Sequence, residues 1–223
     1  MTLDMPTLAA LRARTDDLDA FRVLADRLQA EGDPRGELIS LQLLGQPRLV
    51  ERHLAMHARA LLGRLFTHQS SLALGWEAGF IRHATVSSQE GFVQRRWDGR
   101  LVAEHRTRRP FAWLTAELLQ LESAVLLETL SLSLVRSSRT KELFAAALEA
   151  VARFAPPTVT RLTVHCTPEP YDRYAWERGD DPDEVMPWSA IERQVAFHGR
   201  HLTLVADEVS LLDHAHAVLR DGG

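Results

Sequence analysis

The sequence predicts an α/β protein in which a helical module, residues 1–70, leads into a short, irregular parallel β/α array, residues 71–223. Two observations predict this class. Apolar residues recur at helical spacing through the first third of the chain, whereas short stretches of period-two alternation and helical stretches take turns in the remainder. Strand, helix and strand at these lengths favour parallel pairing through right-handed crossovers, so about four parallel strands are expected, packed as one unit with the module.

The first third contains three predicted helices joined by short turns. Asp16 or Asp17 can cap the first helix, and Gly32 follows it, where a left-handed residue is needed. Asp33 is a suitable N-cap for the second helix, and Pro34 a suitable first helical residue, because its missing amide hydrogen would be unpaired there. Short links predict antiparallel neighbours in a small bundle. The predicted helices cover 17–30, 34–44 and 47–66.

The turn between the first two helices carries a recognisable string, FRVLADRLQAEGDPRGELISLQ. It resembles the bacterial repeat-companion domain, a short helical module found mostly in myxobacteria and planctomycetes beside leucine-rich or other repeats. The resemblance implies repeat neighbours and carries no known chemistry, so it transfers no catalytic residue. The matching residues are Ala25, Asp26, Leu28, Gly32, Asp33, Pro34, Arg35, Glu37, Leu38, Ile39, Leu41 and Gln42.

Four short strands are predicted after residue 71, with helices over 111–121 and 141–154 between them. The strands fit a degenerate Leu-x-x-Leu-x-Leu template, and the tryptophan-bearing lead-in GWEAGFIRHATVS is similar to leucine-rich-repeat-like proteins. The Asn that follows the strand in true leucine-rich repeats is absent, so the array is interpreted as leucine-rich-repeat-like. The apolar strand positions are Ile81, Ala84, Val86, Leu127, Leu130, Leu132, Val159, Leu162, Val164, Leu202 and Leu204.

Bulk composition argues for a cytoplasmic protein that does not enter a membrane, and the resemblance to the repeat-companion domain implies a bacterial source. The formal net charge is −4, so no global cationic field gathers nucleic acid or lipid. Cys166 is the only cysteine, which suits a reducing compartment. No apolar run of about 18 residues occurs, so no transmembrane helix is expected.

The sequence offers no assembled catalytic or cofactor motif. A Gly-rich phosphate loop, a Gly-x-Ser-x-Gly elbow and a paired Cys-x-x-Cys are all absent, so we expect no enzyme and no cofactor. His165 and Cys166 raise the question of a nucleophile, but a thiol that ends an apolar strand is expected to be buried and inert. A pocket that joined both residues to a carboxylate would revive an enzymatic role.

Two histidine groups have spacings that a metal could use. His53 and His57 are four residues apart on a predicted helix, and Asp213, His214 and His216 cluster near the C-terminus. The first pair supplies two ligands, which do not make a site, and a lone cluster in the last turns is usually on the surface, so we expect no metal. A solvated helix face is the expected environment of the first pair.

Two insertions follow predicted strands and are expected to emerge on the same side of the array. The basic insertion, 88–110, includes Trp97, and the acidic insertion, 167–190, is rich in aromatic residues and proline. Aromatic side chains are the usual anchors of protein interfaces. The expected partner-binding residues are Trp97, Tyr171, Tyr174, Trp176 and Trp188.

The expected function is that of a non-enzymatic protein-interaction or scaffold protein with an unknown protein partner, contacted through the strand face and the two insertions. The alternative is nucleic-acid binding through segment 92–109, where cations could contact phosphates and aromatic rings could stack on bases. The residues expected to carry that alternative are Arg95, Arg96, Arg108 and Arg109.

Overall fold

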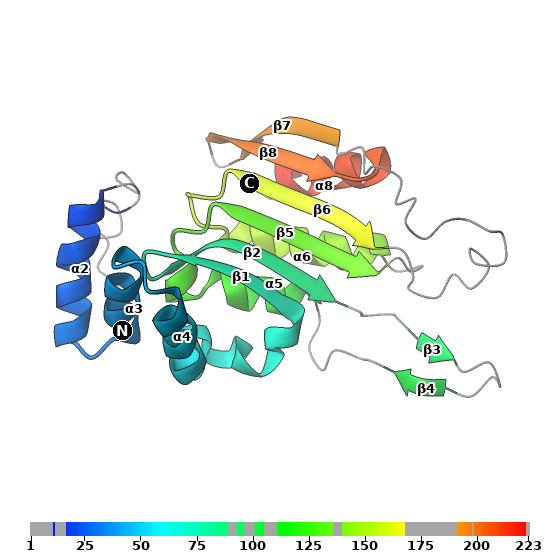
Figure 1. The fold of residues 1–223 in the computed structure, drawn as a ribbon. Helices are drawn as coiled ribbons and strands as arrows, with labels where there is room; N and C mark the ends of the chain where they lie inside the picture. The colour runs from blue at the N-terminus through cyan, green and yellow to red at the C-terminus, as the bar shows by residue number, and fades with distance from the viewer. Residues whose placement is uncertain are drawn as a thin grey trace.

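The computed structural model describes Leu11 and residues 17–88, 93–95, 101–104, 111–135, 140–167, 191–197 and 199–221. Over these residues the protein is a mixed α/β structure with a six-stranded sheet and a separate two-stranded sheet (Figure 1). The elements in chain order are α2 (Leu18–Ala30), α3 (Pro34–Leu43), α4 (Pro47–Leu62), the 3₁₀ helix η1 (Gly63–Ser71), β1 (Leu72–Glu77), β2 (Phe80–Ser88), β3 (Val93–Arg95), β4 (Leu101–Glu104), α5 (Phe111–Leu119), the 3₁₀ helix η2 (Glu122–Ala124), β5 (Thr129–Val135), α6 (Thr140–Phe154), β6 (Arg161–Thr167), β7 (Ile191–Phe197), β8 (Arg200–Ala206) and α8 (Val209–Asp221).

The four predicted strands form the centre of the large sheet. The strand order is β1-β2-β5-β6-β8-β7, and the four inner strands are parallel. Their register aligns the predicted apolar positions in one row, which consists of Ala84, Leu130, Leu162 and Leu204. The parallel array is therefore confirmed at the level of strands and register.

Both edge strands are antiparallel, and neither was predicted. β1 forms a hairpin with β2, and β7 forms a hairpin with β8. β1 lacks clean alternation because the register shifts between Gly75 and Trp76, and β7 (IERQVAF) contains charged residues that weaken its apolar pattern. The return through β7 also removes the need for a helical crossover between β6 and β8. The last parallel pair, β6 and β8, is therefore joined through an antiparallel strand, whereas the sequence predicted a direct strand-helix-strand crossover.

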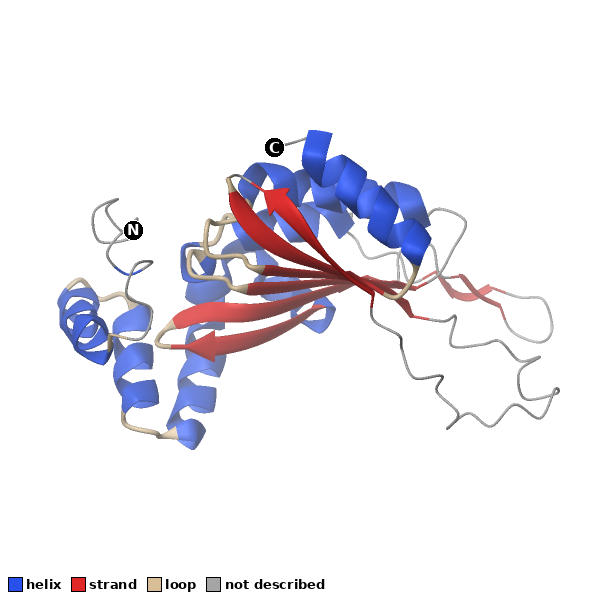
Figure 2. Ribbon diagram, turned by 90° about the horizontal axis from the view of Figure 1, so that it is seen from above, coloured by secondary structure: helices blue, strands red, loops and turns tan. Residues whose placement is uncertain are grey.

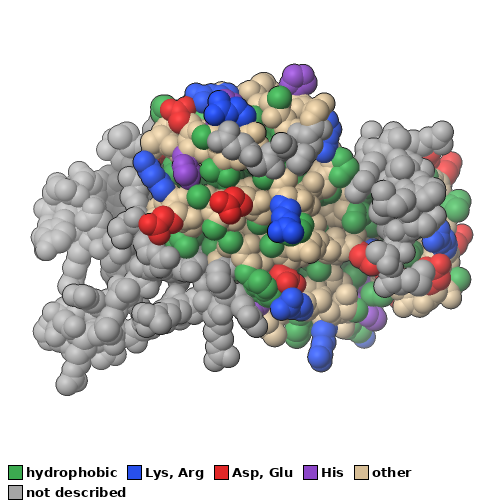
Figure 3. Space-filling model, turned by 180° about the vertical axis from the view of Figure 1, so that it is seen from behind, with side chains coloured by type: hydrophobic (Ala, Val, Ile, Leu, Met, Phe, Trp, Pro, Cys, Tyr) green, Lys and Arg blue, Asp and Glu red, His purple; other side chains and the backbone are tan. Residues whose placement is uncertain are grey.

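One face of the sheet is covered by helices. α5, α6 and α8 lie behind the strands in Figure 1, and Figure 2 shows these helices on one side of the sheet. The strands contribute alternate apolar side chains to a single core with them, in which Phe111 and Phe144 meet edge to face at 6.1 Å between ring centroids. On the outer surface of this side, basic and acidic side chains are scattered and do not gather by sign (Figure 3).

The helical module packs against the turn between β1 and β2. Phe21 and Ile39 share a small core with Phe80, at the start of β2. The amide of Gln42 clamps the turn, because its Nε2 donates to the carbonyl of Trp76 at 2.7 Å and its Oε1 accepts from the backbone N–H of Gly79 at 2.6 Å. The module therefore fixes the amino-terminal end of β2, opposite the end from which the basic insertion begins.

The local signals for the first two helices are confirmed. Asp17 caps α2 and Asp33 caps α3, each accepting a backbone N–H, and Gly32 has a φ of +73°. The predicted third helix, 47–66, is wrong at its end. α4 stops at Leu62 because Gly63 has a φ of +52°, and the chain continues as a 3₁₀ helix.

We predict that Gly79→Ala destabilises the fold more than Gly32→Ala. Both glycines have a positive φ, +78° and +73°, so either alanine incurs the left-handed strain of about 1–2 kcal/mol. A methyl group at Gly79 would also overlap Cγ1 of Ile39, whereas one at Gly32 meets no atom within 4 Å. Overpacking should cost Gly79→Ala about a further 1–3 kcal/mol. Urea unfolding measures both values, and equal losses would contradict the tight contact between α3 and the turn.

Candidate functional site

The face of the sheet opposite the helices carries short hydroxyl side chains on its four inner strands, with larger polar, charged and apolar side chains among them. Because side chains alternate along each strand, the residues between the core positions share this open face. The register places them in rows that cross the sheet. One row contains Gly75, His83, Thr129, Arg161, Thr203 and Gln194, and the next contains Ala73, Thr85, Ser131, Thr163, Val205 and Glu192.

Hydrogen bonds and an ion pair link neighbouring strands across this open face. His83 Nδ1 lies 2.7 Å from Thr129 Oγ1, and Gln194 Nε2 donates to Thr203 Oγ1 at 2.9 Å. Arg161 pairs with Glu192 at 2.5 Å. A hydroxyl can both donate and accept, and short side chains lose little rotamer entropy when covered. The open face can therefore form many hydrogen bonds with a partner at a small entropic cost.

The carboxyl ends of the parallel strands bring Ser133, His165 and Asp207 together. Ser133 and His165 are register partners, and Asp207 Oδ2 accepts from the backbone N–H of Cys166 at 2.8 Å. Burial lowers the pKa of the His165 imidazole below its ordinary value, and the nearby charge of Asp207 partly opposes this effect. The Cys166 side chain is buried in the helix-side core, as expected for an inert thiol. His165 and the Cys166 thiol thus face opposite sides of the sheet.

The motif that resembles the repeat-companion domain builds a buried ion cluster. Arg35 is only 4% exposed, and its Nη2 contacts Asp33 at 2.5 Å and Glu122 at 2.9 Å. Burial acts to raise the pKa of the Asp33 carboxyl, but hydrogen bonds from Arg35 and its positive charge outweigh this and hold that pKa below its usual value. The motif therefore joins α3 to the segment before β5.

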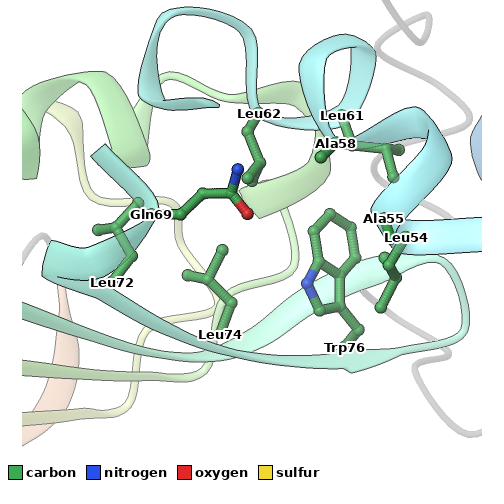
Figure 4. Close-up of a pocket in the computed structure, with 9 residues that line it drawn as sticks. All are labelled: Leu54, Ala55, Ala58, Leu61, Leu62, Gln69, Leu72, Leu74 and Trp76. Carbon is green, nitrogen blue, oxygen red and sulfur yellow. The ribbon is translucent and has the colours of Figure 1, made fainter. Parts of the chain in front are cut away.

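A pocket that was not predicted lies between α4 and β1. It has a volume of about 340 Å³, and Figure 4 shows its side chains converging from α4, η1 and β1. No local sequence pattern could find it, because it requires α4 to lie opposite β1. The lining residues are Leu54, Ala55, Ala58, Leu61, Leu62, Gln69, Leu72, Leu74 and Trp76.

The expected environment of the first histidine pair is wrong. His53 is 2% exposed, and its Nε2 lies 2.8 Å from the carbonyl oxygen of Pro34. The ring stacks on His57 with 4.4 Å between centroids. His53 therefore packs α4 against the start of α3. Over the part of the chain that the structure describes, no three His, Cys, Asp or Glu side chains are arranged to hold a metal ion.

The predicted binding residues of the insertions lie outside the described residues. This applies to the expected anchors Trp97, Tyr171, Tyr174, Trp176 and Trp188, and to Arg96, Arg108 and Arg109. The remaining predicted residue, Arg95, lies in β3, where its backbone is described. β2 and β6 run in the same direction within one sheet, so the two strands that precede the insertions have their carboxyl ends on the same side of the sheet.

No protein-family model, curated protein or solved structure matches the chain. Within the described residues, every helix is too short or too polar to cross a membrane.

We predict that Asp33→Asn weakens the fold at neutral pH by about 2 kcal/mol, since it removes the charged partner of a buried arginine. The Asp33 pKa is lower in the folded state, so the wild-type advantage is present above the ordinary pKa near 4. It should disappear as pH falls through the folded-state pKa. Unfolding measured from pH 7 to 2.5 tests this. Asp19→Asn is the control, because its pair with Arg22 is exposed. A constant difference across the range would contradict the assignment.

A second pH prediction concerns His165. Its folded-state pKa is lowered, so the unfolded chain binds more protons below the ordinary pKa of about 6.5. Stability should therefore fall as pH drops below that value. His165→Gln should remove this part of the pH dependence in thermal unfolding. His201→Gln, on the exposed surface of β8, should leave it in place. Identical profiles for wild type and His165→Gln would show that His165 is not the group responsible.

Proposed function

We propose that the protein is a non-enzymatic interaction or scaffold protein of the bacterial cytosol, which binds a protein partner across the open face of its sheet. The observation that carries the proposal is the asymmetry of the two faces. Among the described residues, helices cover one side only, and the other side presents rows with hydroxyl-bearing side chains on the inner strands, with Ser131 and Thr163 at their centre. Such rows form on the strands themselves, so they are held rigid before a partner arrives.

The chemistry of the open face favours a protein partner. Arg161 is paired with Glu192, so the positive charge of its guanidinium is balanced locally on this face. Paired charges attract phosphates weakly, whereas hydroxyls and amides match the donors and acceptors of a protein surface. We expect affinity that changes little with salt, unlike the steep salt dependence of nucleic-acid binding.

The insertions extend this proposal beyond the sheet. The strands before them, β2 and β6, have their carboxyl ends on the same side of the sheet, next to the open face. We propose additional anchors for the partner beyond these strand ends, namely the aromatic residues Trp97, Tyr171, Tyr174, Trp176 and Trp188.

A leucine-rich-repeat-like identity of the array and a repeat-companion identity of the helical module are part of the same proposal. Support comes from the four parallel strands, β2, β5, β6 and β8, which lie side by side in the order in which they occur along the chain, with α5, α6 and α8 all on one side. Further support comes from the buried cluster that Arg35 of the motif makes with Asp33 and Glu122.

We predict that Thr163→Arg weakens partner binding at least tenfold while the fold remains intact. Thr163 lies in the middle of the open face, so an arginine side chain there would block the close approach of a partner. The one acidic residue in the same row is Glu192, which lies on the edge strand β7. Ala146→Arg is the matched control, because Ala146 is exposed on α6, on the helix side. Tagged wild-type protein is used to capture a stoichiometric partner from lysate of its source. The purified partner is then titrated against both variants by calorimetry.

The expected result is a loss of affinity of tenfold or more, about 1.4 kcal/mol, for Thr163→Arg and none for Ala146→Arg. Equal binding by both variants would move the interface away from the open face. Partners lost on nuclease treatment, with binding that falls steeply with salt, would favour the alternative in which Arg95, Arg96, Arg108 and Arg109 bind nucleic acid.

A further inference from the structure

The pocket between α4 and β1 is separate from the open face. Leu72, Leu74 and Trp76 of β1 pack on the helix side of the sheet, whereas Ala73 and Gly75 belong to the rows of the open face. A molecule in this pocket would therefore not compete with a partner that covers those rows.

The side chains that line the pocket are mainly apolar. α4 contributes leucine and alanine side chains, and β1 contributes Leu72, Leu74 and the indole of Trp76. Among the described residues, none of the side chains that line the pocket is ionisable. A volume of about 340 Å³ falls within the range of small-molecule sites. Removal of an unpaired charge from water into such walls is costly, so the walls select a neutral occupant.

Two polar groups interrupt the apolar lining. The Nε2 of Gln69 is engaged by the carbonyl oxygen of Phe66 at 2.9 Å, which leaves Oε1 as the end of the amide that can accept a hydrogen bond. Trp76 supplies an indole N–H, and in Figure 4 its nitrogen is turned toward Leu74, on the side of the Gln69 amide. A donor and an acceptor thus lie on the same side of an apolar cavity, a pattern that orients ligands.

The β1 wall is held in place from behind. Gln42 binds both the Trp76 carbonyl and the Gly79 N–H, so the backbone at Trp76 is fixed by α3. Trp76 also packs against the main core. The pocket is therefore preformed, and a ligand would not have to order this wall on binding.

From these features we propose that the α4–β1 pocket binds a small, neutral, mainly apolar molecule that carries a carboxamide group. Its hydrocarbon part lies along the α4 leucines, its carbonyl accepts from the Trp76 indole, and its N–H donates to Gln69 Oε1. The site is independent of the proposed protein interface.

The test uses the full chain and a neutral fluorescent probe, N-phenyl-1-naphthylamine, whose emission rises in apolar surroundings. Octanamide, octanoate and octylammonium share one chain length and differ in charge. Octanamide should displace the probe, and the two ions should need at least about tenfold higher concentrations, because their charges would be buried without partners. Displacement that is equal for the amide and either ion would overturn the proposal.

Matched variants locate the binding. Ala55 and Ala60 are both exposed on α4, but only Ala55 lines this pocket. Ala55→Leu should weaken probe binding about tenfold, and Ala60→Leu should leave it unchanged. Trp76→Phe keeps an apolar ring and removes the N–H, so it should weaken octanamide by several fold more than it weakens the probe.

Each opposite result rejects the site. No binding to wild type, or equal binding to Ala55→Leu and Ala60→Leu, would exclude a ligand at this position. Sedimentation of the same three proteins distinguishes another occupant. Self-association that is lost only in Ala55→Leu would assign the pocket to a second copy of the chain and overturn the small-molecule proposal. Circular dichroism of each variant confirms that the comparison is between folded proteins.

Discussion

The arrangement of the helical module depends on the ion pairs that the buried guanidinium of Arg35 forms with Asp33 and Glu122. A cation that is only 4% exposed is tolerated because Asp33 and Glu122 both bind it. Asp33 belongs to the turn between α2 and α3, and Glu122 belongs to η2, just before β5. Removal of either acid leaves the charge under-compensated. The module therefore has one favourable position against the sheet. Because α4 belongs to the module, the α4 wall of the pocket is fixed in place with it.

One face of the sheet forms the core that stabilises the fold, and the other carries the side chains proposed to bind a partner. Alternate residues of β5 illustrate this, because Leu130 and Leu132 enter the core while Thr129 and Ser131 lie on the open face. A substitution at the core positions is expected to act through packing, whereas one at the hydroxyl positions changes the surface alone. Binding specificity could thus change with little effect on folding.

Sequence reasoning found the elements whose signals are local. Asp17 and Asp33 begin helices because their carboxylates accept backbone N–H groups, and Gly32 follows a helix because it adopts a positive φ; the structure confirms all three. The four parallel strands were also found from their alternation. The edge strands β1 and β7 were missed because a register shift and charged residues obscure their period. The burial of His53 and the α4–β1 pocket could not be predicted, since both depend on how distant segments pack. The anchors in the insertions stay predictions.

The antiparallel hairpins at both edges bear on how such an array can change in length. Solenoids gain or lose copies of a unit because each unit presents the next with an equivalent surface. Here the outermost strands, β1 and β7, run against the four strands between them. A duplicated strand-helix unit added at either margin would meet a neighbour of the wrong direction. Evolutionary growth of this sheet would therefore proceed by insertion between β2 and β8, and terminal fusion would leave the number of parallel strands unchanged.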